Sequence, residues 1–258
     1  MSYIIDGLRS PIGNFTGTLS AVRTDDLAAY PMRALMAKYP QLADEIDDVI
    51  LGCANQAGED NRNVARMALL LAGLPTSVPG ETVNRLCSSG LSAAVHAHRA
   101  IRAGEGDLFI AGGVENMTRG PWVISKTSNA FGRDAQMYDS SFGWRFINPA
   151  LDALYGSDGM GETAENLVDL YKISREDQDL FAYRSQMKAA AAQKNGRLAK
   201  EIVPVEIPQR KKDPIIFAQD EFIRADSSLE VLAKLRPAFR KTGGSVTAGN
   251  ASGLNDGA

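Results

Sequence analysis

Hydrophobic and polar positions in the first half of the chain predict short strands alternating with helices. Apolar side chains are concentrated in residues 2–8 (SYIIDGL) and 48–53 (DVILGC), two short runs that predict β-strands. Residues 63–71 (NVARMALLL) predict a helix, as do residues 24–38, where Thr24 is followed by two aspartates and is a suitable N-cap. Pro31 lies inside this second helix and is expected to kink it.

The next segment predicts a β-strand, a helix and a second β-strand in succession. Residues 81–86 are strand-like, residues 88–103 are helix-like with Gly104 as their stop, and residues 108–112 (LFIAG) form a continuous apolar run. Such a crossover implies parallel strands with the helix packed on the sheet. Because the helix begins with small residues, it is expected to approach another backbone closely and to be a central helix: Ser88, Ser89, Gly90, Ser92, Ala93, Ala94.

The texture changes in the second half of the chain. Residues 121–160 are rich in Ser, Asn, Gly and aromatic residues with little periodicity, which predicts a long functional loop region. Ser174 and Asp177 form a capping-box pattern for a helix that extends to about Asn195. Residues 203–208 (VPVEIP) predict a strand, and residues 243–258 begin as a strand before becoming rich in Gly, Asn and Ser. The fold class expected from these elements is α/β.

Composition narrows the classes of partner. The 258 residues are 44% hydrophobic and 23% charged, with a net charge of −3, so no nucleic-acid partner is expected. The longest basic run, residues 210–212, fits a solvated loop better than a phosphate site. Two cysteines do not make a disulfide framework, and we expect neither a signal segment nor a membrane span. These features favour the cytoplasm.

Cys87 lies where a predicted strand ends and a predicted helix begins. The unpaired N–H groups of a first helical turn and the helix dipole stabilise a thiolate at such a position. The N–H of a nucleophile can also donate to an oxyanion. However, a lone cysteine is often a small buried hydrophobic residue, so position alone leaves both readings open.

A nucleophilic thiol usually needs a histidine partner, and the chain has only two histidines. Both lie on the helix that follows Cys87. At 100° and 1.5 Å per residue, His98 shares the face of Cys87 but lies roughly 16 Å along the axis, and His96 faces nearly the opposite way at about 13 Å. Neither can reach the thiol. Either Cys87 is inert, or its partner comes from outside these 258 residues.

Several motifs resemble those of the thiolase family, the acyl-CoA C-acetyltransferases. They follow one another in family order over essentially the whole chain: residues 6–29, 84–90 (NRLCSSG), 101–123 (IRAGEGDLFIAGGVENMTRGPWV), 159–167 (GMGETAENL) and 235–258. Residues 51–75 and 143–149 (GWRFINP) look most like the 3-oxoadipyl-CoA (beta-ketoadipyl-CoA) thiolases of aromatic compound degradation. The resemblance covers about the first two thirds of a thiolase. The family's Gly-His-Pro, Asn-Glu-Ala-Phe and Cys-x-Gly-Gly motifs do not occur in these residues.

The resemblance implies a thiolase fold, layered α-β-α-β-α in the full enzyme. This chain would supply the N-terminal mixed-sheet half plus a loop domain, with the C-terminal half missing. The implied domains are residues 1–120 as the N-terminal half-domain, 121–246 as the CoA-binding loop domain, and 247–258 as a truncated strand returning to the first. Without a second half, an apolar face around residues 88–103 is expected to be exposed.

The resemblance also implies the chemistry. Cys87 matches the nucleophile that attacks the 3-keto carbonyl of a 3-oxoacyl-CoA, as in β-oxidation, and passes the shortened acyl group to CoA. The motifs that do not occur here would supply the activating histidine, the second cysteine for the acetyl-CoA carbanion, and a glycine for half of the oxyanion hole. This chain alone is therefore expected to be inactive or capable of acylation only.

Further residues match the family's CoA contacts. They are Arg224 on the adenine side, Leu235 and Phe239 as apolar contacts, Ala248 and Ser252 along the pantetheine arm, and Met160 beside the reactive end. For Leu235 and Met160, plain core packing is an equal alternative. CoA or acyl-CoA is implied as a substrate, with no covalently bound cofactor, no metal site and a homodimer or homotetramer as the assembly.

One departure from the family bears on the substrate. Biosynthetic acetoacetyl-CoA thiolases carry Tyr-His-Met-Gly where this chain has residues 157–161 (SDGMG), so a short-chain biosynthetic role is in doubt. A dicarboxylyl substrate needs a cation near its distal carboxylate, and Arg145 is the candidate. The alternatives are an acetoacetyl-CoA thiolase, a non-catalytic fragment that binds CoA or dimerises, and, less favoured, a decarboxylating ketoacyl synthase of the same superfamily.

Overall fold

The computed structural model describes residues 1–258, which form two compact units. The first unit comprises Met1–Gly120, Leu198–Glu221 and Leu254–Ala258, and the second comprises Pro121–Arg197 and Phe222–Gly253.

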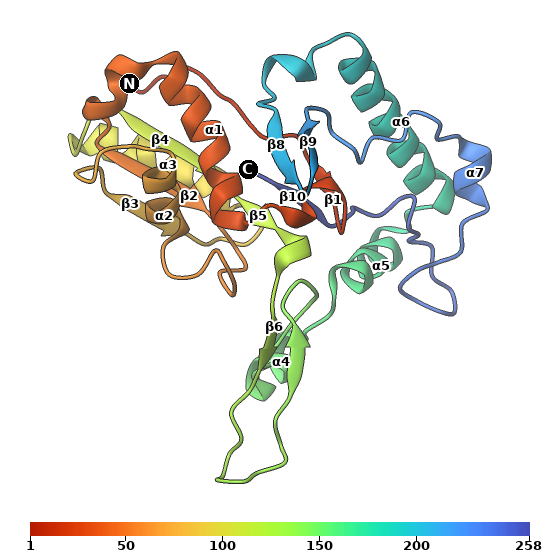
Figure 1. Cartoon of the computed structure of the whole chain (residues 1–258). Coiled ribbons are helices and arrows are strands. Elements are labelled where there is room, and N and C mark those ends of the chain that lie inside the picture. Colours follow the sequence, from red (N-terminus) through yellow and green to blue (C-terminus); the bar gives the residue numbers. More distant parts are fainter. The chain divides into compact units, whose positions relative to one another are not determined.

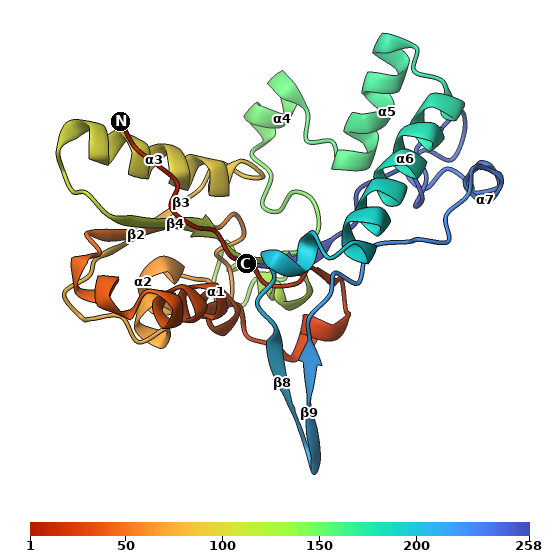
Figure 2. The same ribbon diagram turned by 90° about the horizontal axis from the view of Figure 1, so that it is seen from above.

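The first unit is built on a three-stranded parallel sheet in the order β3-β2-β4. Its strands are β2 (Asp48–Gly52), β3 (Gly80–Val83) and β4 (Phe109–Gly113). Helix α3 (Ser89–Ala103) connects β3 to β4 and covers one face, while α1 (Thr24–Lys38) and α2 (Val64–Leu71) cover the other (Figures 1 and 2). The predicted strand–helix–strand crossover is confirmed, with β2 inserted between its two strands.

Side chains alternate along β2 and divide the core in two. Val49 and Leu51 point into the larger cluster, which includes residues of α1 and α2. Ile50 belongs to a smaller cluster with Val83, Ala93 and Ala97 under α3. This is the period of two expected for a strand covered on both faces, so the sheet fixes α3 and its N-terminal turn.

The helix ends mostly follow the sequence signals. The Asn63 side chain caps α2 by accepting the N–H of Arg66, and Gly104 ends α3 in a left-handed conformation with φ of 78°. The predicted N-cap of α1 is wrong: Arg23 occupies the cap position, and Thr24 is the first helical residue. A carboxylate distant in sequence replaces the cap, because the N–H of Thr24 donates to Glu59 Oε2 at 3.1 Å. The helix continues past Pro31 to Lys38.

Two predicted strands are absent. Residues 2–8 pair with no neighbouring strand, and Tyr3, Ile4 and Ile5 are largely exposed. Residues 243–248 are not a strand, because the N–H groups of Ser245 and Val246 both donate to the Glu165 carboxylate rather than to a ladder. The last strand lies further along the chain. It is β10 (Asn255–Gly257), between β1 (Gly13–Asn14) and β5 (Glu115–Asn116) in an antiparallel sheet.

A hairpin assigned by sequence to the loop domain lies in the first unit. It consists of β8 (Val205–Gln209) and β9 (Lys212–Phe217), and Figure 2 shows it as an extended ribbon. Val205, Ile207 and Phe217 are buried in the larger core cluster, which explains why residues 198–221 belong to this unit. The basic run lies at the exposed turn of the hairpin, as expected for a solvated loop.

The second unit is mostly helical. Its helices are α4 (Pro149–Tyr155), α5 (Met160–Tyr171), α6 (Arg175–Lys194) and α7 (Leu229–Ala233), and its one ladder pairs β6 (Trp122–Ile124) with β7 (Met137–Asp139). Ser174 caps α6 by accepting the N–H of Asp177, as the capping-box pattern predicted. The four short 3-10 helices all lie in the first unit: Thr18–Ala21, Pro40–Glu45, Met117–Arg119 and Leu198–Lys200.

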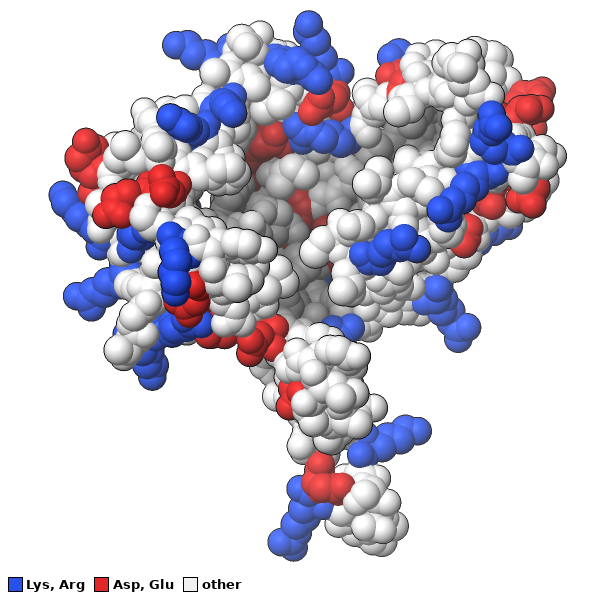
Figure 3. All heavy atoms as spheres, turned by 180° about the vertical axis from the view of Figure 1, so that it is seen from behind, with Lys and Arg blue, Asp and Glu red and all other residues white.

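The surface and the helices bear on possible partners. None of the helices combines the length and the apolar character needed to cross a membrane. On the face drawn in Figure 3, basic and acidic side chains are interspersed rather than gathered by sign. This is the surface expected for a net charge of −3.

Candidate active site

Cys87 lies on a short turn between the end of β3 at Val83 and the start of α3 at Ser89. Its side chain is exposed, whereas Cys53, the other cysteine, is buried. The reading of Cys87 as a small core residue therefore does not fit the structure. An exposed thiol two residues before a helix is placed where the first-turn N–H groups and the helix dipole favour negative charge.

The residue before Cys87 has a strained backbone. Leu86 has φ of +50°, a left-handed conformation that costs a non-glycine residue about 1–2 kcal/mol. Its N–H donates to Asn84 Oδ1 at 2.9 Å, and its carbonyl accepts the N–H of Ser89 at 3.0 Å. The turn thus holds both backbone polar groups of Leu86, which offsets the strain and gives Cys87 a defined direction.

The first turn of α3 lies directly against the end of β2. A Cβ atom added to Gly52 would lie 2.3 Å from the backbone carbon of Ser89 and 2.4 Å from the nitrogen of Gly90. Only glycine permits that approach, and the Ser89 side chain is itself only 4% exposed. The predicted close backbone contact of this helix is confirmed. The opposite face of α3 carries the exposed apolar residues Leu91 and Val95, in line with the exposed apolar face expected around residues 88–103.

Each histidine has a partner other than Cys87 within the first unit. His96 Nδ1 lies 3.7 Å from Glu81 Oε1, and His98 Nδ1 lies 2.6 Å from Ser2 Oγ. Both residues are part of the helix surface, as the helical geometry predicted. The 258 residues thus supply the thiol and its N–H, but no histidine base paired with the thiol.

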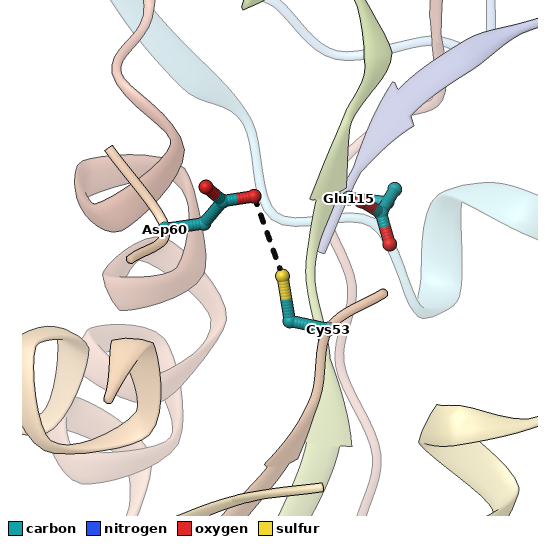
Figure 4. A group of neighbouring side chains, drawn as sticks. All are labelled: Cys53, Asp60 and Glu115. Carbon is teal, nitrogen blue, oxygen red and sulfur yellow. Dashed lines mark hydrogen bonds between the residues drawn. The ribbon is translucent and has the colours of Figure 1, made fainter. Parts of the chain in front are cut away.

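A cluster of three titratable side chains lies just after the end of β2. The Cys53 sulfur and carboxylate oxygens of Asp60 and Glu115 all lie within 4.8 Å of one another (Figure 4). The Cys53 thiol donates to Asp60 Oδ2 at 3.5 Å. The carboxylates already accept backbone N–H groups: Glu115 from Ala54 and Asn55, and Asp60 from Gln56 and Gly58. These bonds indicate that the cluster anchors the loop after β2.

Burial sets the chemistry of this cluster. It raises the pKa of the Cys53 thiol, and the nearby carboxylates of Glu115 and Asp60 raise it further. It also raises the pKa of Glu115, while the two backbone N–H bonds act in the opposite direction. Cys53 is therefore a poor source of thiolate at neutral pH.

We accordingly expect iodoacetamide to modify one cysteine per folded chain. Cys87 should react because its thiol is exposed, whereas Cys53 is 1% exposed with a raised pKa and should react only after unfolding. Peptide mass mapping before and after addition of urea measures the two sites separately. Modification of Cys53 in the native protein at a rate similar to that of Cys87 would contradict this assignment.

The residues expected to contact CoA all lie in the second unit. Gly249 packs against Leu235, so the loop carrying Ala248 meets the end of α7. Pro237 and Thr247 form an isolated antiparallel β-bridge, which holds the segment carrying Phe239 beside the same loop. The Phe239 ring also lies against Gly161, next to Met160. Met160 and Phe239 are exposed, so simple core packing is not their role.

The two remaining residues of this group lie at the edges of the same unit. Ser252 is exposed and precedes Gly253, which packs against the Phe222 ring. The backbone N–H of Arg224 donates to Gln186 Oε1 on α6 at 2.8 Å, and its side chain is exposed. The structure thus presents these side chains at the surface, where a ligand could reach them.

Sequence reasoning missed the residues that hold this surface in place. Glu165 is 1% exposed and fixes residues 245 and 246 through three hydrogen bonds. Arg175 donates to the carbonyls of Leu232 and Leu235 and so fixes the end of α7. The acid within the motif GMGETAENL was a possible signal, but its partners are about 80 residues away.

Arg145, the candidate for a distal carboxylate, lies between β7 and α4. Its Nη1 donates to the Ser140 carbonyl at 3.3 Å, and the side chain is half-buried. The neighbouring Phe146 ring meets Tyr138 edge-on at 5.0 Å between centroids. These contacts order the segment that carries the guanidinium.

Comparison with known proteins gives consistent matches. A family model described as "Thiolase, N-terminal domain" matches residues 2–258. The chain is 58% identical to the "Beta-ketoadipyl-CoA thiolase" of Acinetobacter baylyi, covering 100% of this chain and 64% of that protein. Identity and coverage are the same for the "3-oxoadipyl-CoA/3-oxo-5,6-dehydrosuberyl-CoA thiolase" of Escherichia coli. The crystal structure of the Bacillus anthracis acetyl-CoA acetyltransferase matches with a TM-score of 0.87 at 41% identity, covering 98% of this chain and 62% of that one. The chain thus spans less than two thirds of the length of these relatives.

Proposed function

The chain belongs to the thiolase family, and from this premise we propose that it carries the acyl-accepting half of a 3-oxoacyl-CoA thiolase site. The observation that carries the proposal is the exposed thiol of Cys87, held on a strained turn directly before α3. A buried or loosely held cysteine would not support it. The proposal concerns an activity of the whole protein, of which these residues supply one part.

The proposed reaction follows from the chemistry of a thiolate beside a 3-keto thioester. The Cys87 sulfur attacks the 3-keto carbon, and the N–H of Cys87 donates to the oxyanion that forms. The bond between carbons 2 and 3 then breaks, and its electron pair leaves with acetyl-CoA as a carbanion that takes up a proton. The thiolate of free CoA next attacks the acyl-Cys87 thioester, which releases the shortened acyl-CoA and restores the thiol.

Some groups that this reaction requires are not among residues 1–258. A base for Cys87, an acid for the carbanion and a second donor to the oxyanion would have to come from residues outside these. Acylation of Cys87 from a preformed acyl-CoA needs the fewest of them. It is therefore the part of the reaction assigned to this chain, and turnover by these residues alone is expected to be negligible.

We propose 3-oxoadipyl-CoA as the substrate. The two relatives at 58% identity bear names of that substrate class, and Arg145 offers a cation to a distal carboxylate. Cleavage of this six-carbon diacid thioester leaves a succinyl group on Cys87 and releases acetyl-CoA. CoA itself would be held by residues of the second unit, of which Leu235 is half-buried and the others are exposed: Arg224, Leu235, Phe239, Ala248, Ser252 and Met160.

The substrate proposal predicts a selective effect of Arg145→Ala. An ionic hydrogen bond contributes about 1.5–3 kcal/mol, so succinylation of Cys87 by succinyl-CoA should slow by roughly 10- to 100-fold. Acetylation by acetyl-CoA should change little, because an acetyl group has no distal carboxylate. Intact-mass measurement of the complete protein after timed incubation gives both rates.

Arg210→Ala is the matched control for this experiment. This substitution removes one positive charge, as Arg145→Ala does, but from the exposed turn between β8 and β9. Neither the succinylation rate nor the acetylation rate should therefore change. Equal succinyl-to-acetyl ratios for Arg145→Ala and the unaltered protein would contradict the dicarboxylyl assignment. That result would favour the second candidate, an acetoacetyl-CoA thiolase, which the similarity to the Bacillus anthracis acetyl-CoA acetyltransferase supports.

A non-catalytic role gives a different result in the same assay. A chain that only binds CoA or dimerises would show no acyl mass on Cys87 with either thioester. We further propose a homodimer or homotetramer as the assembly, to be measured by analytical ultracentrifugation. A reducing compartment such as the cytoplasm fits a reaction that needs a free thiol.

A further inference from the structure

The hydroxyl of Ser89 makes two hydrogen bonds within the turn that carries Cys87. It accepts the N–H of Arg85 at 2.8 Å and donates to the carbonyl of Leu86 at 2.6 Å. The side chain is only 4% exposed, so water does not replace these bonds. One buried hydroxyl therefore connects the residue before the strained Leu86 with Leu86 itself.

The second bond has a consequence for Cys87. The carbonyl of Leu86 and the N–H of Cys87 belong to the same peptide group, which is planar and trans, so the two point in opposite directions. Ser89 holds the carbonyl toward the start of α3 through both its hydroxyl and its own N–H. The N–H of Cys87 must then point away from the helix start. The backbone hydrogen bonds of the turn do not include one from this N–H.

The opposite side of Leu86 is held independently. Asn84 Oδ1 accepts the N–H of Leu86 at 2.9 Å, and Asn84 Nδ2 donates to the carbonyl of Ala54 at 3.0 Å. Asn84 thus ties the turn to the loop after β2, while Ser89 ties it to α3. Between them they hold Leu86 at a φ of +50°.

We propose that Ser89 is a positioning residue that orients the Leu86–Cys87 peptide, and hence the oxyanion-donating N–H of Cys87, without touching the substrate. This inference rests on the proposed function, because it assigns a role within the same acyl-transfer site. A positioning role predicts a difference between two classes of reaction that a purely structural role does not predict. Ser89 should matter for reactions that form an oxyanion at the attacked carbon, and not for reactions of the same thiol that form none.

Two reactions of Cys87 separate these roles. Acylation by acetyl-CoA passes through a tetrahedral oxyanion, whereas alkylation by iodoacetamide displaces iodide and places no negative charge on a carbonyl oxygen. In Ser89→Ala the carbonyl of Leu86 keeps the bond from the N–H of residue 89 but loses the bond from the hydroxyl, so the peptide is held less firmly. Since removal of one oxyanion donor costs about 10²–10³-fold, we expect acylation to slow by about 10- to 100-fold and alkylation to change by less than about threefold.

The chain supplies a matched control and a rescue. Ser88→Ala removes the neighbouring exposed hydroxyl, which makes no capping bond, and should leave both rates unchanged. Ser89→Thr keeps a hydroxyl at the same position and should restore most of the acylation rate. With the complete protein in turnover, the loss in Ser89→Ala should be in kcat rather than in KM.

Three results would overturn the inference. They are acylation of Ser89→Ala at the unaltered rate, an equal fall in acylation and alkylation, and no rescue by threonine. If Ser89→Ala does not fold, Asn84→Ala at the exposed side of the turn provides the same test, with acylation expected to fall severalfold and alkylation little. Absence of acylation in the unaltered protein is a separate result, and it would refute the proposed function itself.

Discussion

Cys87→Ser is expected to abolish acyl transfer and to leave the fold intact. A serine hydroxyl without a paired base is a much weaker nucleophile than a thiolate, and both histidines of the chain are paired with other residues. Acylation by acetyl-CoA or succinyl-CoA should therefore fall by about three orders of magnitude or more. Because the side chain is exposed, the free energy of unfolding should change by no more than about 0.5 kcal/mol. Intact mass and urea unfolding measure the two effects.

Cys53→Ser is the matched substitution, with the opposite expected result. Acylation at Cys87 should be retained, because Cys53 belongs to the loop anchor and not to the turn. The buried site exchanges a thiol for a more polar hydroxyl, so stability should fall by about 1–2 kcal/mol. If acylation survived Cys87→Ser but was lost in Cys53→Ser, the acylated thiol would be Cys53. That result would contradict the proposed site.

The elements predicted best from the sequence are those whose formation depends on local pattern. β2, α2, the β3-α3-β4 crossover and the capping of α6 carry their own signals of apolar runs, cap residues and a terminal glycine. Residues 2–8 have an equally strong apolar run, but a strand also requires a neighbour, and none pairs with them here. The 245–246 backbone fails as a strand for the opposite reason, since the distant Glu165 satisfies it.

The sequence singles out a candidate for the site, but it does not predict the geometry around that candidate. Cys87 follows from its position at a strand–helix junction and from the family motif. The left-handed Leu86 and the two bonds of the Ser89 hydroxyl leave no trace in a pattern of apolar and polar residues. In the sequence, Ser89 is one of the small residues at the start of α3, and its small size allows the close packing against Gly52. Its hydroxyl also makes two hydrogen bonds in the turn, which the sequence pattern does not predict.

Gly52→Ala should be among the most destabilising single substitutions in the first unit, although it adds only one methyl group. That Cβ would lie 2.3 Å and 2.4 Å from backbone atoms of Ser89 and Gly90, which no side-chain rotation can relieve. The start of α3 or the end of β2 has to move, which we expect to cost about 3 kcal/mol. Since Cys87 lies on the turn leading into α3, acylation should slow as well. Urea unfolding and timed acylation measure the two changes.

Gly90→Ala tests whether contact, rather than loss of a glycine, is responsible. A Cβ at Gly90 would meet only the carbonyl of Gly112 at 3.8 Å, an ordinary distance, and the position is helical. Alanine is favoured over glycine in a helix by about 0.5–1 kcal/mol, so this variant should be slightly more stable. The same chemical change on the two sides of one contact therefore has opposite expected signs. If both variants lost similar stability, the close approach of β2 to α3 would not be what positions Cys87, and this account of the turn would be wrong.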